Sequence, residues 1–169
     1  MRTHTASDTQ LNRLFSYLTL SESKREENDE REMAERYCEI AARVTEVDVS
    51  AYYRFPKSKT ARRATWLNFM AKRGGEELPQ RLSTEGAHLE ILTSYRKAVV
   101  QLTPEGPFPQ MLIAPTARSA LAVYVETSTT ERGVLFLNSR IPYYFTGAHI
   151  GLMEALAEWI NSKRGAHNG

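Results

Sequence analysis

The feature that most constrains the fold is a pair of apolar segments near the C-terminal end, at 119–126 and 133–138. In the second segment every position from Val134 to Leu137 is apolar, so both faces of a strand formed there would be apolar. Such a strand is covered on both faces and lies inside a sheet. The polar stretch between the two segments is typical of a hairpin connection. The sequence therefore predicts an antiparallel sheet with 133–138 as a central strand.

An amphipathic helix is expected directly after this hairpin. Thr146 is a suitable N-cap, because its side chain can accept hydrogen bonds from the free amides of a first turn. The apolar residues that follow recur at helical spacing: Ile150, Met153, Ala157 and Ile160, widened by Leu152, Leu156 and Trp159. A stripe of this kind packs against the rest of a domain.

The N-terminal third favours helix. One apolar stripe consists of Met33, Tyr37, Ile40, Ala41 and Val44, and the charged run before it is interpreted as the exposed first turns of the same helix. An earlier stripe consists of Leu11, Leu14, Phe15 and Leu18, preceded by Ser7 and Gln10 at the spacing of a capping box. We divide the chain into a helical arm at 1–28, a domain at 29–164 and a tail at 165–169.

The middle of the chain is expected to alternate strands and helix. The pattern predicts a strand at 47–55, its hairpin partner at 64–71, a helix at 85–101 and a short strand at 111–114. The resulting fold class is α+β: a central antiparallel sheet of five to six strands flanked by helices, with an N-terminal helical arm. The helices that start at Met33 and Thr146 should pack together on one face of the sheet.

Bulk composition argues against several classes of protein. The 22 lysines and arginines nearly balance the 20 acids, giving a formal charge of +2, which disfavours nucleic-acid binding. The single cysteine, Cys38, cannot form a disulfide within the chain. No apolar run approaches the roughly 20 residues that cross a bilayer, and the N-terminus lacks the apolar stretch of a signal peptide. We expect a soluble cytoplasmic protein without nucleic-acid or membrane partners.

The closing segment at 118–160 resembles the end of a GAF domain. The resemblance rests on the Gly133–Asn138 strand, Pro142, Phe145-Thr146 and the helical stretch Leu152–Ala157. The upstream order of helix, strand, strand, helix and strand is also compatible with that family. The resemblance implies a GAF-like fold and, with it, a sensory or regulatory role.

The resemblance also bears on chemistry. Cyclic-nucleotide-binding GAF domains often carry an Asn-Lys-Phe-Asp-Glu set, of which this chain matches Asn138 and Phe145. Ser139 replaces the lysine, and Ala148 and His149 replace the acids, which argues against cyclic-nucleotide binding. Another branch reduces free methionine sulfoxide with several cysteines, whereas Cys38 has no resolving partner here. We therefore expect a protein that is not an enzyme, and the sequence identifies no cofactor.

A ligand pocket, if present, is implied by the family geometry between the sheet and the segment 74–115. The candidate ligand-binding residues are Trp66, Phe69, Leu92, Tyr95, Arg96, Phe108 and Arg118. The guanidinium of Arg96 or Arg118 would suit an anionic group. The four histidines are dispersed and form no metal site; His88 and His149 are single candidates for a ligand contact, the alternative being an exposed or capping histidine.

Two functions follow from these observations. The first is a stand-alone sensory GAF-like domain that binds a small molecule and signals through a regulatory protein partner or its own dimer. The alternative is a GAF-like interaction module with no ligand. In both cases we expect a homodimer formed through the N-terminal arm and the first and last helices, because the stripe containing Leu11 and Leu18 must be covered. The alternative is that the arm folds back on its own domain and covers the stripe there.

Overall fold

The computed structural model describes residues 6–23, 30–56, 66–95, 97–126 and 131–168. The helices are α1 (Asp8–Ser23), α2 (Glu30–Thr45), α3 (Ala87–Glu90) and α4 (Gly147–Asn168), with a π-helical turn η2 (Ile91–Tyr95) and a 3₁₀ turn η3 (Pro109–Met111). The strands are β1 (Val49–Arg54), β2 (Trp66–Arg73), β3 (Arg81–Ser83), β4 (Val99–Gln101), β5 (Ser119–Glu126) and β6 (Arg132–Ser139).

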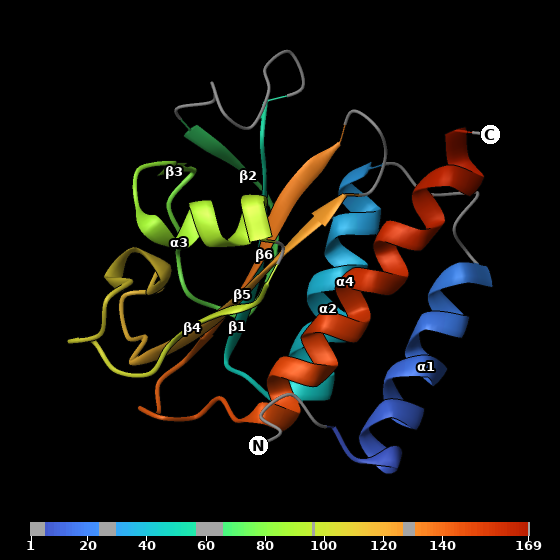
Figure 1. The fold of residues 1–169 in the computed structure, drawn as a ribbon, viewed down its shortest axis with the longest axis horizontal. Coiled ribbons are helices and arrows are strands. Elements are labelled where there is room, and N and C mark those ends of the chain that lie inside the picture. Colours follow the sequence, from blue (N-terminus) through green and yellow to red (C-terminus); the bar gives the residue numbers. More distant parts are fainter. Residues whose placement is uncertain (1–5, 24–29, 57–65, 96, 127–130, 169) are drawn as a thin grey trace.

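The strands form one six-stranded sheet in the order β3-β2-β1-β6-β5-β4, and every neighbouring pair is antiparallel (Figure 1). Strand β6 lies between β1 and β5, with Val49 opposite Asn138 on one side and Ser119 opposite Ser139 on the other. The prediction of a central strand at 133–138 is therefore confirmed. The β5–β6 and β1–β2 hairpins are confirmed as well.

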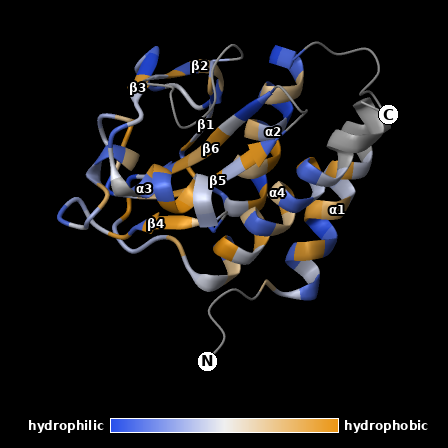
Figure 2. Ribbon diagram, turned by 45° about the horizontal axis from the view of Figure 1, so that its top comes forward, coloured by the Kyte–Doolittle hydropathy of each residue, from blue (hydrophilic) through white to orange (hydrophobic). Residues whose placement is uncertain are grey.

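Helices α2 and α4 pack together on one face of the sheet, as predicted, and α1 lies against both of them (Figure 1). The hydrophobic colouring of Figure 2 gathers in the strands and on the helix surfaces that face them. Cys38 and Leu137 belong to this helical layer of the core. The predicted α+β fold class is confirmed.

The apolar stripe of helix α1 packs against the rest of the same domain. Leu14 and Leu18 are buried in the same core cluster as α2 and α4, whereas Phe15 is 50% exposed. The domain itself therefore covers Leu14 and Leu18 of this stripe, and the homodimer stays a prediction. The capping box is confirmed: the Ser7 amide donates to Gln10 Oε1 and the Gln10 amide donates to Ser7 Oγ.

The opposite face of the sheet is covered by short elements, and here the sequence prediction fails in two places. The helix expected at 85–101 ends as the π-helical turn at Tyr95, and 99–101 is strand β4, paired with β5. The strand expected at 111–114 is absent, because the amides of Ile113 and Ala114 donate to the Asn138 side chain instead of to a neighbouring strand. Strand β3 was not anticipated.

Among the residues that the structure describes, no helix has the length and apolar character needed to span a membrane.

Candidate ligand-binding site

A mostly enclosed cavity of about 90 Å³ lies between the sheet and α3. Its walls come from five elements: β2, β3 and α3, which are close in sequence, and η3 and β6, which are distant from them. The lining residues are Leu67, Leu82, Ser83, His88, Gln110 and Phe136. An enclosed, largely apolar cavity with a few polar groups has the character of a small-molecule site.

His88 is the most unusual residue of this cavity. The residue is 2% exposed, and its Nδ1 is buried without a hydrogen-bond partner among the described residues. The ring lies 6.4 Å from that of Phe108, measured between centroids. A buried polar atom without a partner costs about 1–3 kcal/mol. A bound molecule that hydrogen-bonds to His88 would recover part of that cost.

Burial keeps His88 uncharged. Loss of solvation lowers the pKa of its imidazole to about 4, so the ring is neutral at pH 7. A neutral imidazole carries one hydrogen-bond donor and one acceptor. The cavity therefore offers a polar contact without a charge.

Gly86 creates the space in which the His88 ring lies. Its φ of +133° is a conformation that residues with a side chain rarely adopt. A Cβ at this position would lie 2.7 Å from both Nδ1 and Cε1 of His88. The glycine is thus required both by the backbone turn into α3 and by the close approach of the ring.

The segment 103–114, which supplies Gln110 to the cavity lining, is held by two buried amide side chains. Asn138 Oδ1 accepts from the amides of Ile113 and Ala114 at 2.8 and 3.0 Å, and Nδ2 donates to the Met111 carbonyl at 3.0 Å. Gln101 Oε1 accepts from the Phe108 amide at 2.6 Å. Asn138, which matches a ligand-contacting position of the cyclic-nucleotide pattern, is here committed to the backbone.

The structure disperses the residues nominated from the sequence. Leu92 is buried in the core beneath α3, and Phe69 and Phe108 pack at the edge of the same cluster. Trp66, Tyr95 and Arg118 are exposed. Arg96 lies outside the described residues. None of the six described nominees is among the residues that line the cavity.

Sequence reasoning missed most of the cavity wall. Leu82 and Ser83 lie on the three-residue strand β3, which is too short to produce a readable pattern, and Gln110 lies on a single 3₁₀ turn. His88 was named only as a lone candidate. The combination Gly86-Ala87-His88 is the one local signal, because a glycine before a short helix permits a close approach of a nearby side chain.

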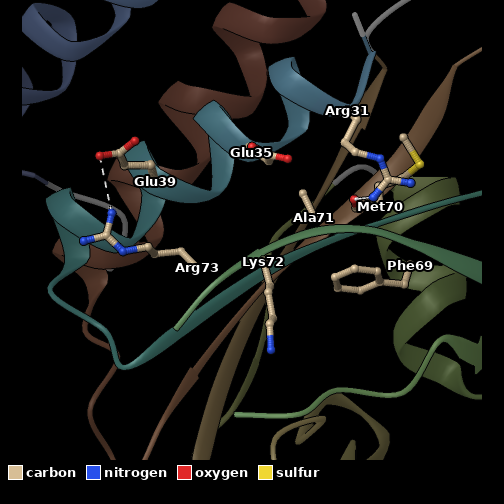
Figure 3. Close-up of a pocket in the computed structure, with 8 residues that line it drawn as sticks. All are labelled: Arg31, Glu35, Glu39, Phe69, Met70, Ala71, Lys72 and Arg73. Carbon is tan, nitrogen blue, oxygen red and sulfur yellow. Dashed lines mark hydrogen bonds and ion pairs between the residues drawn. The ribbon is translucent and has the colours of Figure 1, made fainter. Parts of the chain in front are cut away.

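A second hollow, of about 370 Å³, is an open groove between α2 and β2 (Figure 3). Its lining is formed by Arg31, Glu35 and Glu39 of α2 and by residues Phe69, Met70, Ala71, Lys72 and Arg73 of β2. The three cations each contact an oxygen of the chain itself: Arg31 the Met70 carbonyl at 2.9 Å, Lys72 the Glu76 carbonyl at 2.5 Å, and Arg73 the Glu39 carboxylate at 3.3 Å. Each cation of the groove thus already has a partner within the chain, and we interpret these charged side chains as structural.

Cys38 lies on the other side of the sheet from the cavity. It is fully buried in the helical layer, with Sγ 3.7 Å from the Ala71 carbonyl oxygen. Burial raises the pKa of its thiol, which disfavours the reactive thiolate. The described residues also contain no group of three or more His, Cys, Asp or Glu side chains placed to hold a metal ion.

Comparison with known protein families finds no matching family, and no curated protein matches the sequence. Similar solved structures include the free methionine-R-sulfoxide reductase of Neisseria meningitidis in complex with its substrate, with 14% identity and a TM-score of 0.72 over 99% of this chain and 97% of that one. The GAF domain of an Acinetobacter phosphoenolpyruvate-protein phosphotransferase has 16% identity and a TM-score of 0.71 over 96% of each chain. The chain has a GAF-like fold, as the sequence resemblance implies.

The expectation that this chain is not an enzyme is corrected by the same comparisons. The type II free methionine-R-sulfoxide reductase of Thermoplasma acidophilum is also similar, with 13% identity and a TM-score of 0.60 over 78% of this chain and 89% of that one. Because enzymes and sensory domains share this fold, the fold does not support a non-enzymatic assignment.

Proposed function

We propose that this protein is a sensory or regulatory GAF-like domain that binds a small molecule in the cavity between the sheet and α3. The observation that carries the proposal is His88, a neutral and buried histidine that lines an enclosed cavity while its Nδ1 lacks a partner among the described residues. Buried polar side chains in native proteins are usually satisfied, so a buried histidine nitrogen that faces a cavity without a partner supports a bound molecule as that partner.

Strand β6 connects this cavity with the helical layer. Phe136 lines the cavity, whereas the adjacent Leu135 and Leu137 point to the opposite face and pack in the core with α2 and α4. A ligand that shifts Phe136 would therefore alter the packing beneath these helices, because a close-packed core transmits small displacements. We propose that the α2–α4 layer is the output surface of the domain.

The test is to fill the cavity. Leu82→Phe adds volume at a partly buried lining residue of β3, and it should abolish ligand binding at a cost in stability of about 1–3 kcal/mol. Native mass spectrometry of the gently purified protein would detect a retained small molecule, which the variant should lose.

Tyr95→Ala is the matched control, because Tyr95 ends the η2 turn above the core yet is 67% exposed. This variant should retain the molecule. The proposal is wrong if Leu82→Phe and the wild type bind the same ligands with the same affinity.

The second candidate is the interaction module, which we propose would act through a homodimer. It is favoured by Ile141 and Tyr143, which are exposed on a connection whose backbone is well fixed. Tyr143 adopts a φ of +58° and its amide donates to the Leu102 carbonyl at 2.8 Å. Sedimentation at micromolar concentration should show a dimer that Tyr143→Ser weakens; a monomeric wild type would eliminate this candidate.

A further inference from the structure

We infer that the ligand of the α3 cavity is a compact, uncharged molecule with an apolar body and one hydroxyl-type group that hydrogen-bonds to His88. This inference rests on the proposed function, since it specifies the chemical class that the same cavity selects. It replaces the anionic ligand that the sequence suggested through Arg96 and Arg118.

The absence of charge follows from the lining. Of the described residues that form the cavity wall, none carries a charged side chain: Leu67, Leu82 and Phe136 are apolar, and Ser83, His88 and Gln110 are neutral and polar. Arg118 is exposed and lies outside this lining. An ion that leaves water without a partner of opposite charge incurs a penalty of several kcal/mol. A charged molecule would therefore bind poorly here.

The hydroxyl-type group follows from His88. Its neutral ring presents a donor on one nitrogen and an acceptor on the other, and its Nδ1 has no partner among the described residues. A hydroxyl both donates and accepts, so it can satisfy Nδ1 in either tautomer. Ser83 is less available, because its Oγ already accepts from the Glu85 amide at 3.1 Å.

The size follows from the volume. The cavity of about 90 Å³ is smaller than the engineered apolar cavity of about 150 Å³ that binds benzene. A molecule no larger than a single small ring would therefore fill it. A phenol or a short-chain alcohol fits these requirements, whereas free methionine sulfoxide carries both an ammonium and a carboxylate that the lining does not neutralise.

Four probes distinguish these classes: phenol, toluene, benzoate and free methionine-R-sulfoxide. Each is titrated into the full chain and followed by ¹H–¹⁵N chemical-shift changes, including the ring nitrogens of His88. We expect phenol to bind about tenfold more tightly than toluene, the effect of one hydrogen bond. Benzoate and methionine-R-sulfoxide should not perturb the cavity residues.

Variants of His88 test whether this residue causes the preference for phenol over toluene. His88→Phe should remove the advantage of phenol over toluene, and His88→Gln, which keeps a donor and an acceptor, should retain part of it. If His88→Phe does not fold, the His88 ring ¹⁵N shift on phenol binding and the His88→Gln variant carry the test.

The outcomes separate the two proposals. Binding of benzoate or methionine-R-sulfoxide that Leu82→Phe abolishes would overturn the uncharged class and leave the cavity as a ligand site. Equal binding of phenol and toluene, both sensitive to Leu82→Phe, would overturn only the role of the hydroxyl. If no probe perturbs the cavity residues, the inference fails, and the proposed function is decided separately by whether native mass spectrometry detects a retained molecule that Leu82→Phe loses.

Discussion

At the scale of single residues, the site depends on the pair formed by Gly86 and His88. The histidine supplies the polar contact, and the glycine permits its position through a positive φ and the absence of a Cβ. The two residues are separated by one position in the chain, so the local backbone conformation and the geometry of the cavity are coupled.

Gly86→Ala should destabilise the protein by about 1–3 kcal/mol, because alanine is strained at this φ. Its Cβ would also displace the His88 ring, so phenol binding should be lost. Gly75→Ala is the control, since a Cβ there has no neighbour within 4 Å among the described residues and no positive φ opposes it. Urea denaturation and the phenol titration check both variants. Equal stability of the two would contradict the close approach.

The pH dependence of stability should report His88. Its folded pKa of about 4 lies below the unfolded value of 6.5, so the unfolded chain binds more protons between these values. The free energy of unfolding should therefore fall as pH decreases through this window, by about 2 kcal/mol between pH 7.5 and 5. His88→Phe should flatten that part of the profile.

His149 also makes the free energy of unfolding fall as the pH decreases, so its contribution needs a separate control. Burial lowers the pKa of its imidazole, although Glu46 opposes the shift, and its neutral Nδ1 accepts from the Thr146 amide at 3.1 Å at the start of α4. The pH profiles with His88 and with His88→Phe are therefore compared in a protein that also carries His149→Gln. A slope that persists unchanged after His88→Phe would contradict the assignment to His88.

At the scale of elements, α1 is part of the domain core. Leu14→Ala should reduce the free energy of unfolding by about 2–5 kcal/mol, because it opens a cavity between α1 and the α2–α4 layer. Phe15→Ala, on the half-exposed face of the same helix, should cost no more than about 0.5 kcal/mol. Thermal denaturation of both variants checks this. A comparable loss in Phe15→Ala would indicate that this face is also covered, as in the expected homodimer.

The central strand β6 carries Gly133 at a position where the neighbouring strand β1 leaves no room for a side chain. A Cβ on Gly133 would lie 2.4 Å from the Tyr53 carbonyl and 2.6 Å from the Tyr52 ring. The residue is thus required by the close approach of β1, which no local pattern around Gly133 reveals.

At the scale of the whole molecule, ligand binding should stabilise the fold. At a free phenol concentration ten times its Kd, the free energy of unfolding should rise by about 1.4 kcal/mol, which corresponds to a Tm increase of about 3–6 °C for a domain of this size. Differential scanning calorimetry measures the shift, and Leu82→Phe should abolish it. A shift of the same size in Leu82→Phe would place the binding outside the cavity.

The sequence by itself determined the helices and strands whose apolar residues recur at a regular spacing. The apolar run at 133–138, the hairpins and the stripes of α2 and α4 each carry a periodic pattern, and a period is readable without knowing the neighbours. The resemblance of the closing segment to GAF domains, and the fold that it implies, rest on the same residues.

Only the tertiary structure decided which residues form the candidate site. The cavity is formed by side chains from five elements, among them a three-residue strand and a single turn, and its lining depends on which of them converge. Asn138 illustrates the same limit: the sequence shows only that it matches one position of a family pattern, and its hydrogen bonds to the backbone of Met111, Ile113 and Ala114 appear only in the folded chain. Local patterns record whether a residue is buried, whereas the function of a buried polar group depends on the partner it meets in space.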